Sequence, residues 1–598
     1  KGNYSDVVSV LKSRAGLHFR SFSGSQEATV DIRGFGENSF GRVLVLSNGR
    51  KLNRPDMRGI NWSQIPLANI ERIEVIRGPN GAVYGDSAVG GVINIITKRG
   101  SEEPHGELVI ETGSNKSNRL ALSTYGASGR FDYGLALEHT ETAGWRDRTG
   151  SRTKSGDIKL GYELNDIFRL ELGLMALRTD YELPGSLTKA VYNESPKRAG
   201  NYADEATENY FGITPSLIAE IGDQGEFTLD LGYLEKFIET DMTSWSSWTD
   251  RLLKTLTVSP RYIHRYPIFG LENRFIFGAD WTEERIDLER FSDARRTIYG
   301  GGAIVDKNTL AIYANNSLHI NANFILSLGM RWAESTFKID EENGASTTIQ
   351  KDEHTHREKA YHIGLTHNVT DETKIFTKYE QFFRLPFLDE QISFNGFGSS
   401  FNKELRPETG ESYELGIEQH LAENTDITLT LFRMMMTDEI AYVFPNNVNL
   451  DETLHQGAEL SFTSAPTSTL DMYLNYTWTE AEFDKGANSG NRIPLVPEHK
   501  VALGAEWQFL TAFRVNADVI YTSEMYQGGD NANTNEKMDQ YTVVDLGTAY
   551  SCNILGKTAE IYAKVNNVFD ERYTDFVFFG GYYTAPGRTY NLGMKWRF

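Results

Sequence analysis

The 598-residue sequence has a single cysteine, only 16 prolines and no long run of apolar residues. One cysteine, Cys552, excludes an internal disulfide, and no Cys/His spacing resembles a zinc site. With no apolar run near ~18 residues, the chain has no candidate transmembrane helix. No basic block stands out against a net charge of −22, which argues against a nucleic-acid-binding protein. No signal peptide is recognised at Lys1, so composition alone would predict a large, acidic, soluble protein.

The order of the residues contradicts that prediction, because from about residue 106 onward apolar and polar residues alternate in short runs. In one run, Phe131, Tyr133, Leu135 and Leu137 are separated by single polar or small residues. Successive side chains of a β-strand point to opposite faces, so such a run predicts a strand with one apolar face. The same pattern recurs at 158–164, 170–174, 326–332, 503–507 and 592–598.

Two folds use strands of this kind. In a soluble β-sandwich the apolar face packs on a second sheet, and in an outer-membrane barrel it faces lipid. Residues 106–598 contain no linker or long helical segment that would divide them, and sandwich domains have only about 100 residues each. At roughly 22 residues per strand and connection, the stretch supplies about 22 strands, the size of plugged outer-membrane transporters. The predicted fold is therefore mainly β, a 22-stranded antiparallel transmembrane barrel.

Turn signals divide the connections between strands into two classes. Short turns are predicted at 165–166, 222–223, 370–371 and 424–426, and long loops at 180–208, 285–305, 387–404 and 524–540. Short periplasmic turns and long extracellular loops are typical of outer-membrane barrels. The two classes therefore indicate the orientation of the barrel in the membrane.

The first hundred residues differ from the rest and indicate a small α+β unit. A short amphipathic helix is predicted at 6–17, and strands at 29–33, 42–46, 70–77 and 92–97. A 22-stranded barrel without a filling would leave an open hole in the membrane. We therefore predict a plug domain over residues 1–105, lying in the lumen of a barrel domain over residues 106–598.

Several motifs of this unit resemble the plug of TonB-dependent outer-membrane transporters, of the siderophore and cobalamin receptor type. They lie at 32–36 (Ile-Arg-Gly-Phe-Gly), 43–50, 70–79, 82–85 and 90–97, and residues 565–573, 586–588 and 598 resemble the last strands of the same family. The likeness covers the whole chain in order, plug and then barrel. Family members carry a Ton box before the plug helix, and none precedes Asp6, so the resemblance implies a mature N-terminus upstream of Lys1.

The resemblance implies a function and a set of partners. The expected function is TonB-dependent import of a scarce metal chelate across the outer membrane of a Gram-negative bacterium. A ferric siderophore is the first expectation and cobalamin the alternative. The implied partners are TonB with its inner-membrane energising complex and the lipid of the outer membrane. No nucleic acid, no resident cofactor and a monomeric state are expected.

A passive porin or an outer-membrane barrel enzyme is the alternative of another class. Neither needs a plug, and the plug motifs therefore argue against both. No Ser/His/Asp or paired-carboxylate arrangement indicates catalysis. We expect a protein that is not an enzyme.

Two arginines and two glutamates are candidates for a lock between plug and barrel. Arg33 and Arg77 each follow an apolar strand run and precede a glycine, and Glu414 and Glu459 lie at inward-facing positions of predicted strands. The family places such residues together, and a charge in a water-poor interface must be paired or it is costly. The alternative is that these are ordinary lumen charges in contact with water.

Two plug loops, at 21–28 and 53–64, are expected to face the ligand by resemblance to the apical loops of the family. The second combines cations, amides, a thioether and an aromatic ring, a mixture that suits a binding site. Its candidate ligand-binding residues are Arg54, Asp56, Met57, Arg58, Asn61 and Trp62. The arginines would supply donor forks to carboxylate, catecholate or phosphate oxygens. The alternative is a solvated loop tip.

Three tryptophans have two open interpretations. Trp245 and Trp248 lie near a predicted strand end, and the same interpretations apply to Trp145. They could anchor the barrel in a membrane girdle or contact the ligand from extracellular loops. We keep Trp245 and Trp248 as candidate loop contacts.

Two histidines lie close together in a predicted polar loop. His354 and His356 could bind a metal, but surface histidines are commoner, and no metal site is predicted. Haem receptors of the family show a loop histidine between two motifs that resemble residues 383–386 and 405–408. No histidine occurs in that interval here, which disfavours haem as the ligand.

Overall fold

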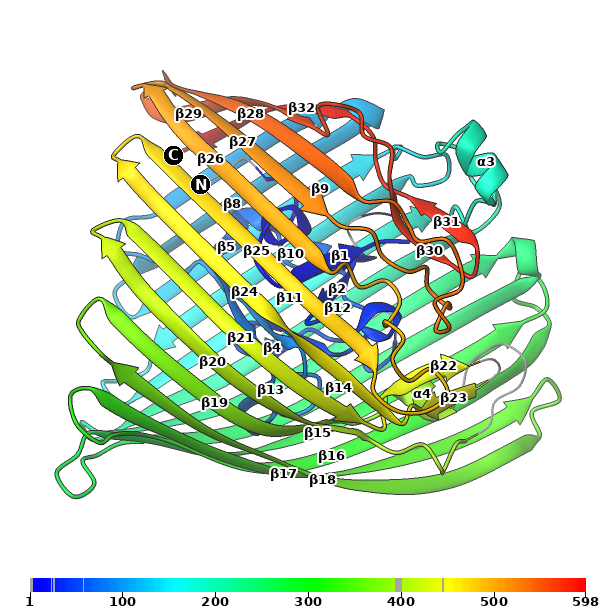
Figure 1. Cartoon of the computed structure of the whole chain (residues 1–598), viewed down its shortest axis with the longest axis horizontal. Coiled ribbons are helices and arrows are strands. Elements are labelled where there is room, and N and C mark those ends of the chain that lie inside the picture. The colour runs from blue at the N-terminus through cyan, green and yellow to red at the C-terminus, as the bar shows by residue number, and fades with distance from the viewer. Residues whose placement is uncertain (1–3, 23, 25–26, 58, 393–400, 444–445) are drawn as a thin grey trace.

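The computed structural model describes residues 4–598, apart from 23, 25–26, 58, 393–400 and 444–445. Within these residues, 22 antiparallel strands form one closed barrel. Closure is made by β32 (Thr589–Arg597), which pairs with β7 (His105–Gly113) and leaves no open sheet edge. The N-terminal segment lies inside the wall (Figure 1). The predicted 22-stranded barrel with an N-terminal plug is confirmed.

The wall is built from long strands joined mostly as hairpins. Its other strands are β8 (Ser117–Ser128), β9 (Phe131–Thr142), β10 (Ser151–Glu163), β11 (Phe168–Glu182), β12 (Glu205–Ile221), β13 (Gly225–Met242), β14 (Ser247–Arg265), β15 (Asn273–Phe291), β16 (Tyr299–His319), β17 (Phe324–Asn343), β18 (Thr348–Asn368), β19 (Thr373–Arg384), β20 (Glu408–Ala422), β21 (Thr425–Thr437), β24 (Glu452–Thr467), β25 (Leu470–Phe483), β26 (His499–Leu510), β27 (Phe513–Thr522), β28 (Tyr541–Ile554) and β29 (Lys557–Asn566).

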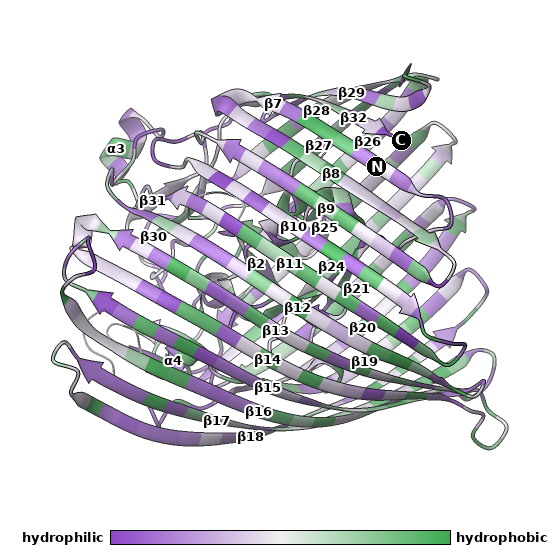
Figure 2. Ribbon diagram, turned by 180° about the vertical axis from the view of Figure 1, so that it is seen from behind, coloured by the Kyte–Doolittle hydropathy of each residue, from purple (hydrophilic) through white to green (hydrophobic). Residues whose placement is uncertain are grey.

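The alternation seen in the sequence separates the two faces of the wall. On β16, Leu310 and Ile312 are exposed on the outside of the wall. Ala311 and Tyr313, which alternate with them, are buried on the inside. Hydrophobic stretches lie in the middle of many strands, and hydrophilic residues prevail toward their ends (Figure 2). In the described part of the chain, no helix is long and apolar enough to cross a membrane. In an outer-membrane barrel, an outward apolar face of this kind is the face that meets lipid.

An arginine on the lipid-facing side should destabilise the barrel. Ile312 is 43% exposed, and its register partners on the neighbouring strands are Ala279 and Trp332. Ile312→Arg is therefore expected to cost about 2–4 kcal/mol of folding free energy in a bilayer. The measurement is equilibrium unfolding in lipid vesicles. The matched control is Ile298→Arg, at an exposed position in the turn between β15 and β16, where little change is expected. Equal losses at both positions would contradict a lipid-facing role for Ile312.

The two ends of the barrel differ as predicted. The predicted short turns at 165–166, 222–223 and 370–371 lie between strands at one end, the end that also holds Phe598. The turn predicted at 424–426 is at the same end but occupies 423–424, because β21 begins at Thr425. The opposite end carries longer connections with structure of their own: α3 (Lys189–Glu194), α4 (Leu388–Ile392), a hairpin of β22 (Ile440–Val443) and β23 (Asn446–Asn449), and a hairpin of β30 (Thr574–Phe578) and β31 (Gly581–Thr584). The short β13–β14 connection at this end forms η6 (Thr243–Trp245). We take the long-loop end as extracellular.

One predicted loop is wrong. Residues 285–305 are mostly strand, because β15 continues to Phe291 and β16 begins at Tyr299. This stretch contains several charged side chains. In the structure they pair across the strands, as Arg285 does with Asp306 (Nη2 to Oδ2 3.1 Å).

The plug is a small mixed sheet with short helices. The sheet order is β4 (Arg50–Lys51), β3 (Val43–Ser47), β6 (Gly91–Thr97) and β5 (Ile70–Arg77), with β3 parallel to β6 and β5 antiparallel to β6. A separate pair joins β1 (Leu17–Arg20) to β2 (Thr29–Ile32). The remaining elements are α1 (Val7–Leu11), η2 (Gly36–Asn38), η3 (Trp62–Gln64), η4 (Leu67–Asn69) and α2 (Gly81–Tyr84).

All four predicted plug strands form, but the predicted helix at 6–17 is too long. The helix α1 starts after Asp6, whose carboxylate caps it by accepting from Ser9 N at 2.7 Å, and it ends at Leu11. The strand β1, which no prediction included, begins at Leu17. Between them Gly16 adopts a φ of +78°, which a continuing helix does not allow.

The plug has its own apolar core. Buried side chains from α1, the sheet and the loops between them pack together, and Trp62 is 5% exposed within this cluster. Its indole Nε1 donates to Ala28 O at 2.8 Å. This core holds the loops that rise toward the extracellular end.

Candidate functional site: the plug apex and the plug–wall contacts

The structure brings together the four residues proposed for the lock. Arg33 follows β2, and its Nη1 lies 2.8 Å from Glu414 Oε1 on β20. Its Nε lies 3.7 Å from Glu459 Oε1 on β24. Arg77, at the end of β5, places Nε 3.7 Å from Glu459 Oε2. Glu459 is therefore shared between the two arginines of the plug.

The local backbone makes room for this cluster. Arg33 has a φ of +70°, an uncommon conformation for a residue other than glycine, and the strand ends there. Gly78, with a φ of +80°, lies against the ion pair, and a Cβ at this position would overlap Glu414 Oε1. The glycine that follows Arg77 is thus required by space as well as by backbone conformation.

The cluster is dry, which makes its charges interdependent. The side chain of Arg33 is fully buried, and those of Glu414 and Glu459 are 7% and 1% exposed. Burial by itself would lower the pKa of Arg33, but the two carboxylates outweigh it and raise the pKa. The guanidinium also lies 4.3 Å from the ring centre of Phe432. Removing either partner would leave a buried charge unpaired.

The apical loop at 53–64 does not present its predicted ligand contacts to an open vestibule. Arg54, Asp56, Asn61 and Trp62 are each at most 5% exposed, so the expectation that they face the extracellular solvent is wrong for this conformation. Met57 is half-buried. Arg58 lies outside the described residues, and its predicted role stays a prediction.

These buried side chains hold the loop to the plug and to the wall. Arg54 Nε lies 2.9 Å from Asp56 Oδ1, and its Nη1 lies 3.8 Å from Glu208 Oε2 on β12. Asn61 Nδ2 donates to Glu208 Oε1 at 3.1 Å, and Lys236 on β13 pairs with the same carboxylate. Asp56 and Glu208 raise the pKa of Arg54 against the effect of its burial. The plug is therefore tied to the wall at β12–β13 as well as at β20 and β24.

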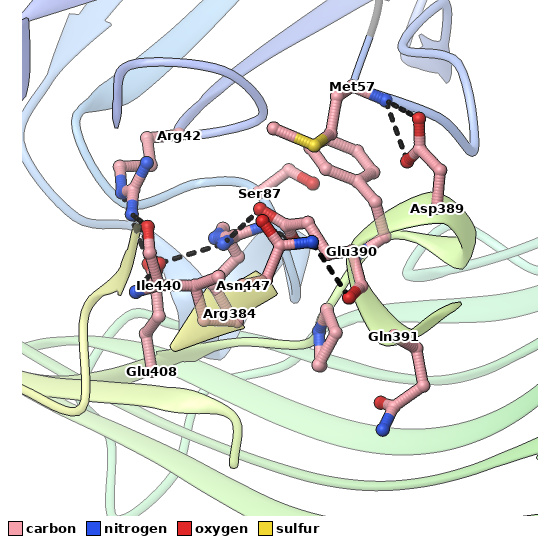
Figure 3. Close-up of polar contacts among 12 residues, drawn as sticks. Arg42, Met57, Ser87, Arg384, Asp389, Glu390, Gln391, Glu408, Ile440 and Asn447 are labelled. Atoms are coloured by element: carbon pink, nitrogen blue, oxygen red, sulfur yellow. Dashed lines mark hydrogen bonds and ion pairs between the residues drawn. The ribbon is translucent and has the colours of Figure 1, made fainter. Parts of the chain in front are cut away.

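An extracellular loop reaches down to the plug apex. In the β19–β20 connection, Leu388 N donates to Pro55 O at 3.1 Å. Met57 N donates to both carboxylate oxygens of Asp389, at 3.0 and 3.2 Å (Figure 3). Burial, together with the charge of Asp56, raises the pKa of Asp389 to about 7. The loop thus covers the residues that were expected to meet the ligand.

A second buried ion network lies beside this contact and escaped the predictions. Glu408 Oε1, at the start of β20, lies 2.7 Å from Arg384 Nη2, and Ile440 N donates to the same oxygen at 2.8 Å. Arg42 of the plug donates from Nε to Glu408 Oε2 at 3.2 Å (Figure 3). Arg384 also binds both carboxylate oxygens of Glu390 on α4, at 2.8 and 2.9 Å.

This network joins the plug, the wall and two extracellular elements. Both Arg42 and Arg384 are 1% exposed, and Glu408 is fully buried. Asn447 of β23 adds a bond to Glu390 O at 2.9 Å. The sequence offered one signal that could have found it, since Arg384 and Glu408 lie in the two motifs at 383–386 and 405–408. From the sequence, the two motifs bore only on whether haem is the ligand.

The first apical loop, at 21–28, meets a different extracellular hairpin. Phe22 packs edge-on against Phe576 and Tyr583, at ring distances of 4.7 and 5.0 Å. Tyr181 Oη donates to Glu27 Oε1 at 3.1 Å. Both apical loops are therefore in contact with extracellular elements of the barrel.

The tryptophans lie at the extracellular end in different environments. Trp245 is 76% exposed in η6, the turn between β13 and β14, whereas Trp248 is 9% exposed at the start of β14. Trp145, in the β9–β10 connection, has Lys197 Nζ 5.2 Å from its ring. Trp245 is the tryptophan of the three that solvent reaches most readily.

The expectation that His354 and His356 lie in a loop is wrong, because both lie within β18. Their rings are 4.6 Å apart, and His356 Nε2 lies 3.0 Å from Gln391 Oε1 on α4. Within the described ranges, no group of three or more His, Cys, Asp or Glu side chains is placed to hold a metal ion. His356 instead supports the loop that covers the plug.

Known protein families match nearly the whole chain. A family model described as "TonB dependent receptor-like, beta-barrel" matches residues 105–568. A second model, "TonB-dependent Receptor Plug Domain", matches residues 1–92. The order of the two matches is the order of plug and barrel in the structure.

Curated relatives resemble the chain over most of its length. The "Iron-regulated outer membrane virulence protein" of Vibrio cholerae serotype O1 is 26% identical, over 99% of this chain and 89% of that protein. The "Vitamin B12 transporter BtuB" of Photobacterium profundum is 23% identical, over 95% and 86%. The "Probable TonB-dependent siderophore receptor PiuA" of Acinetobacter baumannii is 22% identical, over 95% and 85%.

Solved structures share the fold. The unliganded ferric citrate transporter FecA superposes with a TM-score of 0.88 at 18% identity, covering 100% of this chain and 95% of that one. The siderophore receptor PiuA of Acinetobacter baumannii gives a TM-score of 0.84 at 17% identity, with coverages of 99% and 94%. At these identities the likeness shows the fold alone. The family-model matches show more: this chain belongs to the TonB-dependent receptors of the Gram-negative outer membrane.

Proposed function

We propose that this protein imports a ferric siderophore across the outer membrane, driven through TonB. One observation carries the proposal: the plug lies inside the barrel and is held to its wall by buried ion pairs, not by covalent bonds. A filled barrel does not conduct as a passive porin does. Its plug must be rearranged before a chelate passes, and that step needs a source of energy outside this chain.

The nature of the ligand rests on the relatives. One of the relatives is named as iron-regulated and another as a siderophore receptor. The two solved structures named above are a ferric citrate transporter and a siderophore receptor. The vitamin B12 transporter among the relatives makes cobalamin the second candidate. A ferric chelate is our choice because the iron-related names prevail among these matches.

The partners follow from the family. TonB and its inner-membrane energising complex supply the force, outer-membrane lipid surrounds the apolar face, and the protein acts as a monomer. No resident cofactor is expected, because the metal arrives with the ligand. These assignments, with the expectation that the protein is not an enzyme, stay proposals.

Ligand contact at the plug apex takes a different form from the one first predicted. Arg54, Asp56, Asn61 and Trp62 hold the loop in place, so we assign contact at this loop to Met57, whose backbone N–H now binds Asp389. A ligand that reaches Met57 must displace α4. Trp245 is a second candidate contact, because it is exposed at the extracellular end.

The test uses the full-length receptor in the outer membrane of a host that lacks its own iron and cobalamin receptors. The probes are ferric citrate, ferric enterobactin and cyanocobalamin, each labelled on its metal. We expect binding and TonB-dependent uptake of a ferric probe and none of cyanocobalamin. Uptake of cyanocobalamin alone would establish the second candidate. Uptake that persists without TonB would contradict the proposed mechanism.

A further inference from the structure

A cavity lined by both apolar and charged residues lies between the plug and one side of the wall, away from the lock. Its volume is about 570 Å³, within the usual range for small-molecule sites. The plug lines it with β3, β4, β6 and the end of α2, and the wall lines it with strands β10 to β17. On β15 the lining residues run from Arg274 to Glu284, the half of the strand nearest the short-turn end. The cavity thus lies in the periplasmic half of the barrel.

Two side chains of this cavity are buried with polar atoms left unused. Arg331 is 6% exposed and Asn315 is 8% exposed. Among the described residues, Arg331 Nε and Nη1 and both polar atoms of the Asn315 amide have no hydrogen-bond partner. Buried polar groups are paired in most proteins. Unused donors that line a cavity therefore indicate a missing partner of opposite character.

The guanidinium of Arg331 is held in place by three neighbours. Its Nη2 lies 2.5 Å from Asp280 Oδ2, and the group lies 5.1 Å from the ring centre of Tyr313. On the plug side, a Cβ at Gly85 would lie 2.8 Å from Arg331 Nε. Gly85 has a φ of +79° and ends α2, so its bare backbone packs directly on the arginine. The donor fork is fixed before any ligand arrives.

The strand register adds a second arginine to the same row. Arg261 of β14 is opposite Gly278 of β15, Gly278 is opposite Tyr313 of β16, and Tyr313 is opposite Arg331 of β17. Gly278 makes room for the ring of Tyr313, since a Cβ there would overlap the Tyr313 hydroxyl. Arg261 also lines the cavity, and its Nε has no partner within the part of the chain described.

The charges at this end of the cavity favour an anion. Within the described residues, Arg331 forms a salt bridge with Asp280, and Arg261 forms none. One of the two cations is therefore not neutralised by a carboxylate. Guanidinium groups present planar forks that match oxyanions. An amide such as that of Asn315 can donate to the same group.

We propose that Arg331, Arg261 and Asn315 form a transit site for an oxygen anion of the imported chelate, a carboxylate or catecholate. The proposal rests on the proposed function. The site would hold the chelate after it leaves the extracellular end and before it enters the periplasm. It therefore acts on passage and not on capture: loss of its donors slows uptake and leaves binding at the cell surface unchanged.

The experiment compares surface binding with uptake for the same probe. Arg331→Gln and Arg261→Gln are made singly and together in the full-length receptor, and iron-labelled ferric citrate and ferric enterobactin are the probes. Binding is measured in chilled, de-energised cells and uptake in energised cells. For the probe that the parent imports, we expect unchanged surface affinity and uptake reduced by about tenfold in the double variant.

Controls separate the site from a general disturbance of the barrel. Arg261→Gln removes a side chain that has no ion pair in the described structure, so it tests the site even if Arg331→Gln misfolds. Arg514→Gln removes an inward arginine on β27 that pairs with Glu560 (2.9 Å) and does not line the cavity, and it should import like the parent. Vancomycin sensitivity reports whether the plug stays seated.

Uptake at the parental rate in the Arg261→Gln and double variants would overturn the transit site. So would a loss of surface affinity equal to the loss of uptake, because the residues would then act in capture. A parent receptor that imports cyanocobalamin and neither ferric probe would instead overturn the proposed function, and the transit site with it.

Discussion

Replacing Arg33 by methionine is expected to loosen the plug more than any other single change in it. The side chain is fully buried against Glu414 and Glu459. Breaking such a pair leaves two buried carboxylates that must share Arg77 or take up protons, at a cost of about 3–5 kcal/mol. If this cost falls on the seated state of the plug, the population of unseated plugs rises by roughly a hundred- to several-thousandfold.

The measurement is the frequency of channel openings in planar bilayers, with vancomycin sensitivity of whole cells as a second readout. The matched control is Arg72→Met on β5 of the same plug. Arg72 pairs with Glu71 and Glu74, but its side chain is 55% exposed, and exposed pairs contribute about 0–1 kcal/mol. For Arg72→Met we expect no more channel openings than in the parent protein. Similar behaviour of the two variants would show that the Arg33 cluster does not hold the plug.

A double-mutant cycle then separates the lock from general damage. In Arg33→Met with Glu414→Gln, one unpaired carboxylate of the single variant is replaced by a neutral amide. We expect the double variant to open less often than the sum of the single effects predicts. Additive effects would mean that Arg33 and Glu414 do not act on each other.

Glu408→Gln is expected to release the plug apex from the extracellular loops. Its carboxylate binds Arg42 of the plug, Arg384 of β19 and the N–H of Ile440. The amide keeps the size but removes the charge, and it leaves the buried Arg42 with Glu439, 3.7 Å away, as its remaining carboxylate. By analogy with other broken buried pairs, the loss should be about 3 kcal/mol.

Hydrogen–deuterium exchange locates that loss. Amides of α4 at 388–392 and of the hairpin β22–β23 should exchange faster, while those of the strands in the middle of the wall should not change. Glu452→Gln is the control, because Glu452 pairs with Lys485 at an exposed position and the chemical change is the same. Unchanged protection of α4 in Glu408→Gln would contradict a network that couples this loop to the plug.

The parts of this fold that follow local rules could be predicted from residues alone. Alternation in runs such as Phe131–Thr142 predicts strands with one apolar face, and turn residues mark the short connections. The count of 22 strands follows from the length and spacing of those runs. The failures were also local. The stretch 285–305 and the polar segment around His354 and His356 were predicted as loops and are mostly strand, because polar strands that extend beyond the membrane alternate without an apolar face.

The contacts between plug and wall are of another kind. Arg33 is 381 positions from Glu414, and Arg42 is 366 positions from Glu408. The first contact was expected only because of resemblance to a family, and the second was missed. No local pattern distinguishes an arginine that pairs with the wall from one that faces a ligand.

The sequence by itself determined the barrel, its orientation and the presence of a plug, because these depend on the period of the residues and on turns. Only the tertiary structure decided how each charge is used. It placed Arg54 against Glu208, brought Asp389 of an extracellular loop onto Met57, and left Arg331 with unused donors in a cavity. The physical reason is that burial and pairing depend on how the plug is seated and on strand register, which set distances between residues hundreds of positions apart.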